Sequence, residues 1–284
     1  MTTVFMLTSQ SKDQQMMSFI LKSSGHLLVI DGGNSCDADY LCAYIKKLGG
    51  IVDGWFITHP HKDHCNAFSS LMERRADEIK VKTVYYNFPC QEFLKNFDEG
   101  RNSPEVAARF EAQISAQNLP SVTVRRGDVY EFGEIKLTVL REPDENIKVN
   151  GANNASVVYR VDANGTSMMF LGDLGKEGGE QLLATTPPEL LSAELVQVAH
   201  HGQNGVGRDV YDAIDADYCF WCTPEWLWDN NIGLGYDTHC WKTIVTRGWM
   251  SDIGVKWHYI SKDGTQEVPF DDLDPVAHKR KPQN

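Results

Sequence analysis

The chain has 284 residues, of which 42% are hydrophobic and 23% are charged, an ordinary balance for a soluble globular protein. Its 39 acidic and 27 basic residues give a formal net charge of −12, which argues against broad, sequence-independent binding of nucleic acid. There is no apolar run near the length that spans a bilayer, and the N-terminal residues lack the order of a signal peptide. We therefore expect a cytoplasmic protein without a membrane partner. A phosphate-bearing substrate stays possible, because bound divalent cations would reverse the local field.

The first half of the chain is predicted to alternate strands and helices. Apolar runs predict strands at residues 17–22, 26–30, 54–58 and 82–86. Helical periodicity predicts helices at residues 39–48 and 67–80, and two more within residues 91–118.

The second half follows the same logic and ends in a predicted hairpin. Strands are predicted at residues 121–125, 134–140, 156–161, 167–171, 195–199 and 218–223. Helices are predicted at residues 177–184, 209–214 and 238–247. Residues 256–261 and 266–269 should pair as a hairpin around Asp263-Gly264.

Strands and helices mixed in this way in two halves predict two sheets packed face to face with helices outside. The expected fold is an α+β sandwich of four layers, αββα. We expect a single domain over residues 1–270 and a flexible C-terminal tail over residues 271–284.

The segment from His59 to His64 points to a metal site. It holds three imidazoles and the carboxylate of Asp63 within six residues, directly after an apolar run. Neutral imidazole and carboxylate are the ligands that zinc and its first-row neighbours prefer in catalytic sites. On an extended segment His59 and His61 point the same way, whereas Asp63 and His64 diverge. The segment can therefore present ligands to two neighbouring metal positions.

Four later residues lie at the ends of predicted strands or at the start of a predicted helix. Asp173 comes after an apolar strand and a glycine, so it can bridge two cations. His200 and His201 follow the next strand, and at most one of them should point straight at the metals, because successive side chains diverge. The other would orient it or contact substrate. His239 stands at a predicted helix start after an aromatic-rich loop.

The order His-x-His-x-Asp-His, then Gly-Asp, then His-His-Gly resembles the metallo-β-lactamase fold hydrolases. The details resemble one branch, which contains the hydrolase domain of the DNA-uptake protein ComEC/Rec2 and the related phosphorylcholine esterase. The resemblance runs from about residue 15 to residue 270 and includes residues 28–33, 126–128, 153–158, 171–173 and 198–202. The membrane spans of the full uptake protein are absent, so membrane transport is not implied.

The resemblance implies two divalent metal ions, with zinc as first choice and manganese or iron as alternatives. One would be held by His59, His61 and Asp173. The second would be held by Asp63, His64, Asp173 and His200.

This chain departs from many members of the family at one ligand. A further histidine often precedes the strand that begins here at Val157, but there is no histidine between His64 and Asp173. Asn153 or Asn154 occupies that neighbourhood, as in the branch it resembles. The first metal site is then weaker, uses asparagine or water, or prefers Mn²⁺, and the sequence leaves these options open.

The implied chemistry is hydrolysis by a water that two cations activate. Asp63 would orient this water, and His201 or His239 could protonate the leaving group or hold an oxyanion. An aromatic lip over the pocket would be formed by Trp226, Trp228 and Tyr236.

A phosphoester, and most of all a phosphodiester, is the expected substrate class. The alternative within enzymes is hydrolysis of an acyl bond such as a lactam, lactone or thioester, because the same nucleophile serves both. A second alternative is a non-catalytic binding module that keeps its metal for structure. The substrate, the native metal and the oligomeric state are left open by the sequence.

Overall fold

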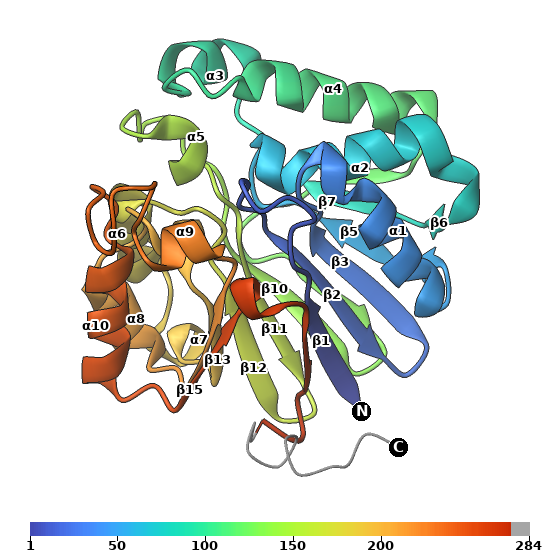
Figure 1. Cartoon of the computed structure of the whole chain (residues 1–284). Coiled ribbons are helices and arrows are strands. Elements are labelled where there is room, and N and C mark those ends of the chain that lie inside the picture. The colour runs from blue at the N-terminus through green and yellow to red at the C-terminus, as the bar shows by residue number, and fades with distance from the viewer. Residues whose placement is uncertain (274–284) are drawn as a thin grey trace.

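The computed structural model of the chain describes residues 1–273, which fold as two packed sheets with helices on both outer faces (Figure 1). Within this part of the chain each sheet has seven strands. The layers therefore follow the order helix, sheet, sheet, helix, which confirms the predicted αββα sandwich.

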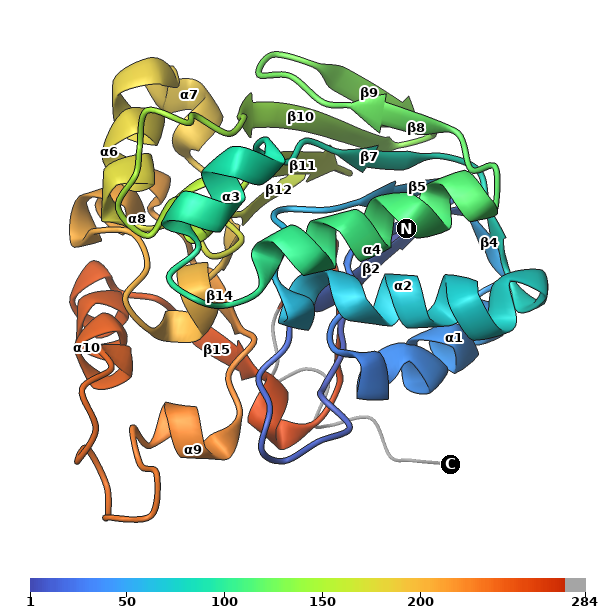
Figure 2. The ribbon, with the colours of Figure 1, turned by 90° about the horizontal axis from the view of Figure 1, so that it is seen from above.

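The first sheet has the strand order β16-β1-β2-β3-β5-β7-β8. Its strands are β1 (Thr2–Met6), β2 (Ser18–Ser23), β3 (His26–Asp31), β5 (Gly54–Phe56), β7 (Val84–Tyr86), β8 (Ser121–Thr123) and β16 (Gln266–Pro269). A small separate ribbon pairs β4 (Ile51–Val52) with β6 (Lys80–Val81). Figure 2 shows the helices of this half, which are α1 (Ala38–Lys47), α2 (Lys62–Arg75), α3 (Gln91–Phe97) and α4 (Ser103–Ala116).

The second sheet has the strand order β15-β14-β13-β12-β11-β10-β9. Its strands are β9 (Val129–Phe132), β10 (Ile135–Arg141), β11 (Val158–Ala163), β12 (Thr166–Phe170), β13 (Leu195–Gln197), β14 (Tyr218–Trp221) and β15 (Trp257–Ile260). The helices of this half are α5 (Gly151–Asn154), α6 (Lys176–Thr185), α7 (Pro188–Leu191), α8 (Arg208–Ile214), α9 (Glu225–Trp228) and α10 (Thr243–Ile253).

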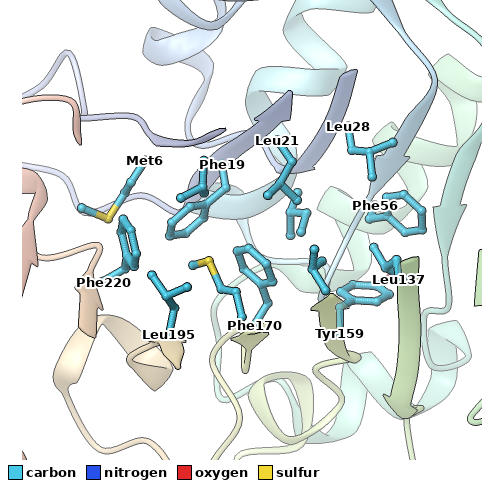
Figure 3. Packing of buried hydrophobic residues seen from close by; sticks show 14 of the residues in the cluster. Met6, Phe19, Leu21, Leu28, Phe56, Leu137, Tyr159, Phe170, Leu195 and Phe220 are labelled. Carbon is cyan, nitrogen blue, oxygen red and sulfur yellow. The ribbon is translucent and has the colours of Figure 1, made fainter. Parts of the chain in front are cut away.

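The core between the sheets is built by alternate residues of the strands. Phe19 and Leu21 of β2 point into it, whereas Ile20 between them packs under the outer helices. Phe170 of β12 meets Phe19 edge to face with 5.1 Å between ring centroids, and Figure 3 shows this packing. Burial of these large apolar side chains stabilises the fold and fixes the two sheets against each other.

The last two strands do not form the predicted hairpin. β15 pairs in parallel with β14 of the second sheet, whereas β16 pairs antiparallel with β1 of the first sheet. The turn at Asp263-Gly264 is therefore a crossover between the sheets. The strand β1, with which β16 pairs, was not predicted, although residues 2–6 are rich in the β-branched and aromatic residues that favour strands.

The helix after the histidine segment begins earlier than predicted. α2 starts at Lys62 rather than at Ala67, so Asp63 and His64 lie in its first turn instead of in a loop. A helix places adjacent side chains about 100° apart, and this geometry sets the directions in which the two ligands point.

The C-terminal end of the described region is packed rather than free. The carbonyl of Leu273 accepts a hydrogen bond from the Tyr259 hydroxyl at 3.1 Å. The expectation of a mobile tail concerns mainly residues 274–284, which lie outside the described residues. Among residues 1–273, no helix combines the length and the apolar character that crossing a membrane requires.

Candidate metal centre

The expected ligands meet at one edge of the sandwich, where strand ends of both sheets come together. His59 and His61 lie between β5 and α2 in the first half, and Asp173 follows β12 in the second half. Two groups of side chains result, each with its ligand atoms within 4.8 Å of one another. The four-residue group contains Asp63, His64, Asp173 and His201, and the three-residue group contains His59, His61 and Asp173.

Asp173 belongs to both groups, and its two oxygens face different histidines. Its Oδ1 lies 3.3 Å from Nε2 of His64. Its Oδ2 lies 3.4 Å from Nε2 of His201 and 3.8 Å from Nε2 of His59. Nε2 of His201 also lies 3.4 Å from Oδ2 of Asp63. One carboxylate therefore stands between two neighbouring sets of ligand atoms.

Most of the ligand atoms are buried and have no hydrogen-bond partner among the described residues. This holds for Asp173 Oδ1 and for the Nε2 atoms of five histidines, which are His59, His61, His64, His200 and His201. Leaving a single buried polar atom unsatisfied costs roughly 1–3 kcal/mol, so such a cluster is unfavourable without a further partner. A divalent cation satisfies imidazole and carboxylate atoms together, and the residues present therefore fit a pair of such ions.

In three of these histidines the other ring nitrogen, Nδ1, has a hydrogen-bond partner, and this leaves the free lone pair on Nε2. Nδ1 of His64 lies 2.7 Å from Asp31 Oδ2, and Nδ1 of His201 lies 2.8 Å from the Cys222 carbonyl. Nδ1 of His59 lies 3.1 Å from the Thr58 hydroxyl, which itself donates to Asp31. Because all three partners accept the Nδ1 proton, each Nε2 is left as a ligand atom.

Asp98, in the loop between α3 and α4, approaches His61 from the side of its unpaired Nε2 atom and not from the opposite nitrogen. Nε2 of His61 lies 3.5 Å from Asp98 Oδ1. Asp98 is held in turn by Ser103, whose backbone N–H and hydroxyl both donate to its carboxylate. The sequence carries no signal for Asp98, since an acidic residue shortly before a glycine is usually part of a turn. Asp31 could have been found, because it lies within the matched segment of residues 28–33.

His200 and His201 do not diverge as predicted. They lie in a 3₁₀ turn, Ala199–Gly202, with left-handed backbone at φ 51° and 53°, rather than on an extended strand. Both Nε2 atoms consequently face Asp173 Oδ2, at 3.8 Å for His200 and 3.4 Å for His201. The four-residue group contains His201 in the place that the resemblance gave to His200. A ligand role of His200 stays a prediction that this geometry does not favour.

His239 is in neither group. It precedes α10, which begins at Thr243 and not at residue 238, and its ring lies 3.8 Å from that of Trp241 between centroids. Its catalytic role therefore stays a prediction.

Of the expected aromatic lip, Trp226 borders a cavity that also touches His61 and Asp63. Trp228 instead packs on Trp221, with 5.2 Å between ring centroids, and Tyr236 is 59% exposed.

The charges of the cluster also point to a cation. Burial lowers the pKa of His59 well below its usual range and that of His200 to about 4. Burial also disfavours the charged forms of His64 and His201, but the negative charge of Asp173 and of other nearby carboxylates has the larger effect. The pKa of His64 is therefore raised strongly and that of His201 to about 9. Burial would raise the pKa of Asp173, yet the surrounding imidazoles hold it well below its usual value. The buried carboxylate stays charged and favours a positive neighbour.

Two cavities flank the ligand groups. The first cavity has a volume of about 390 Å³ and is bordered by Gln15, His61, Lys62, Asp63, Arg101 and Trp226, among others. The second cavity has a volume of about 700 Å³ and is bordered by Arg101, Lys176, His200, Gln203, Lys242 and Trp249, among others. Such volumes are typical of small-molecule sites.

The chain belongs to the metallo-β-lactamase superfamily, since the family model described as "Metallo-beta-lactamase superfamily" matches residues 13–217. This confirms the family that the sequence motifs indicated. ComE operon protein 3 of Bacillus subtilis (strain 168) is 27% identical over 164 residues, which supports the ComEC-like branch. That match covers 57% of this chain but 18% of the relative, so the chain corresponds to a small part of that protein.

Several solved structures share the fold at low sequence identity. The metallo-beta-lactamase fold protein YhfI from Bacillus subtilis has a TM-score of 0.56 at 11% identity, covering 94% of this chain and 100% of that chain. Zn²⁺-bound PqqB from Methylobacterium extorquens has a TM-score of 0.51 at 11% identity, covering 95% and 100%. A diphosphatase from the PhnP family has a TM-score of 0.50 at 11% identity, covering 95% and 98%. These likenesses establish the architecture of the chain.

Proposed function

We propose that this protein is a metal-dependent hydrolase of phosphoesters, most specifically of phosphodiesters, formed by a single domain over residues 1–270. The observation that carries the proposal is the set of buried, unpaired ligand atoms in two groups that share Asp173. The four-residue group would hold one divalent cation and the three-residue group the other, with zinc as first choice. The chemistry that such cations supply is Lewis-acid activation of water and of a phosphoryl oxygen.

The residues of the chain position the reacting groups around this centre. Asp63 is fixed on two sides, because Oδ2 accepts a hydrogen bond from Gln15 Nε2 at 3.1 Å and lies 3.4 Å from His201 Nε2. Gln15 is itself held by Gln203, whose Nε2 donates to Oε1 of Gln15 at 2.6 Å. This bridge between the two halves keeps Asp63 aimed at the first cavity, where it can orient an attacking water.

Two features favour a phosphoester over an acyl bond. The cations Lys62 and Arg101 border the cavities beside the ligand groups, and they suit an anionic substrate in a chain of net charge −12. A pair of cations also suits in-line displacement at phosphorus. A protein of similar fold is described as a diphosphatase, which agrees with this choice.

The test compares bis-p-nitrophenyl phosphate with a chromogenic lactam and a thioester, on protein loaded with Zn²⁺, Mn²⁺ or Mg²⁺. We expect turnover of the phosphodiester with at least one metal and its loss after chelation. Turnover of only the lactam or thioester would replace the phosphoester by the acyl alternative. Bound metal without any turnover would support the non-catalytic module. A His61→Ala variant that keeps its circular dichroism but loses hydrolysis ties the activity to this centre.

A further inference from the structure

The two cavities beside the ligand groups share one wall, the side chain of Arg101. His61 and Asp63 border the first cavity and His200 borders the second, so the ligand groups lie at the junction. A substrate whose scissile bond sits at this junction extends into both cavities. The part of the substrate that enters the second cavity therefore lies beside Arg101.

We propose that Arg101 and the second cavity form a subsite for an additional anionic group, so that the substrate is a phosphodiester bearing a second phosphate. This inference rests on the proposed phosphodiesterase function and names its substrate class. A guanidinium binds phosphate through two parallel N–H donors, which makes arginine the typical residue for this recognition.

The guanidinium of Arg101 is available for a ligand. Within residues 1–273 it makes no ion pair or hydrogen bond, and only its backbone N–H is engaged, with the Asp98 carbonyl. The neighbouring Arg109 behaves differently, because Glu73 accepts hydrogen bonds from its Nε and Nη2 atoms at 2.8 and 2.6 Å. Arg101 is therefore a cation at a cavity wall that the protein itself leaves without a counter-ion.

The charges around the second cavity leave room for an anion. Lys242 borders it without an ion pair in the described region, and Lys176 is only loosely paired, 3.7 Å from Glu180. Three acidic residues border it too and keep their negative charge, against the four basic residues Arg101, Lys176, Arg208 and Lys242. Glu99 accepts from the Asn150 N–H, Glu177 accepts from Asn154 Nδ2, and Asp209 accepts from the Val210 N–H. Arg101 and Lys242, which have no ion pair in the described region, are thus the basic side chains available to bind substrate.

The loop that carries Arg101 is anchored at the ligand groups. Asp98, three residues before it, faces His61 and is fixed by Ser103. Glu99 and Asn102, on either side, hold left-handed backbone at φ 55° and 64°, which non-glycine residues adopt at a cost. The same short loop therefore carries a carboxylate beside a ligand histidine and places Arg101 beside both cavities.

The test uses two substrates that differ by one phosphate, thymidine 5′-(p-nitrophenyl phosphate) and its 3′-phosphorylated form. We expect the protein to show a KM at least about tenfold lower for the 3′-phosphorylated substrate, since a charge-assisted pair contributes about 1.5–3 kcal/mol. Arg101→Ala should remove this preference and leave the metal content unchanged. Arg101→Lys should keep part of it. Arg125→Ala, which changes an exposed arginine paired with Glu142, is the matched control and should change nothing.

A binding measurement separates this subsite from catalysis. Calorimetry with thymidine 3′,5′-bisphosphate, on the protein as purified and after chelation, should give an affinity that Arg101→Ala lowers about tenfold or more. If hydrolysis occurs but both substrates have equal KM in the original protein and in Arg101→Ala, the subsite is refuted and the proposed function stands. If no phosphodiester is hydrolysed, the proposed function fails, and calorimetry alone decides whether Arg101 binds a second phosphate.

Discussion

The two ligand groups differ in number of ligands and in how firmly their histidines are held. In the four-residue group, His64 has Asp31 at 2.7 Å behind it and His201 has the Cys222 carbonyl at 2.8 Å. In the three-residue group, Nδ1 of His59 has a neutral hydroxyl, that of Thr58, at the longer distance of 3.1 Å, and Asp98 lies on the ligand side of His61. Because outer partners orient ligands and raise their basicity, we expect the four-residue group to bind its cation more tightly.

The group expected to be weaker is also the one for which the family resemblance implies a further histidine that this chain lacks. Asn153 lies in that neighbourhood, fully buried, with Nδ2 donating to Asn150 at 2.9 Å and Oδ1 left without a partner among the described residues. We therefore expect this centre to contain one tightly bound cation and one exchangeable cation.

The largest effect is expected from Asp173→Ala, because this carboxylate serves both groups. Losing an outer partner of a ligand costs about 10–100-fold, so losing the shared ligand should cost more than about 100-fold in kcat/KM. Metal content measured by plasma mass spectrometry should fall at both positions. Asp39→Ala, at an exposed carboxylate on α1, is the control and should retain both metals. Full metal content in Asp173→Ala would contradict the shared-ligand geometry.

The next largest effect is a loss of metal, which we expect from only one of the adjacent residues His200 and His201. His201→Ala should remove the metal of the four-residue group, whereas His200→Ala should keep both metals, because only His201 belongs to that group. Metal content and circular dichroism of both variants provide the measurement. If His200→Ala lost the metal and His201→Ala kept it, the assignment that the family resemblance implied would be restored.

A smaller effect is expected from Asp31 and Asp98, whose carboxylates lie beside ligand histidines. Asp31→Asn should weaken the tighter cation toward the upper end of the 10–100-fold range, and Asp98→Asn should weaken the other cation toward the lower end. The reason is the difference between 2.7 and 3.5 Å to the respective histidine. Competition with a chelating dye measures both affinities, and thermal melts show whether each variant folds. A greater loss from Asp98→Asn would reverse the proposed ranking.

The smallest effect is expected from His239→Ala. This side chain stacks on Trp241 and belongs to neither group, so metal content should stay unchanged. A surface substitution typically changes free energies by no more than about 0.5 kcal/mol, which corresponds to roughly a twofold change in kcat/KM. A loss of hundredfold or more at full metal content would show that His239 acts on the substrate, as the sequence suggested.

Much of this centre was readable from the sequence because its ligands are carried by contiguous or strand-terminal motifs. The segment His59–His64 packs its ligands into six residues, and its chemistry alone indicates a metal. Asp173 could be placed because it follows a clearly apolar strand, and strand ends of both halves meet at one edge. The alternation of apolar residues likewise predicted most strands and the layered fold.

Only the tertiary structure decided which histidine of a pair turns inward and what stands behind each ligand. His200 and His201 look equivalent in sequence, and their left-handed backbone, imposed by surrounding contacts, overrides the alternation expected on a strand. The pairing of β16 with β1 joins residues more than 250 positions apart, which no local pattern encodes. Asp98 and Arg101 gained their roles in the same way, because a loop between two helices is placed beside the ligands by packing rather than by its own residues.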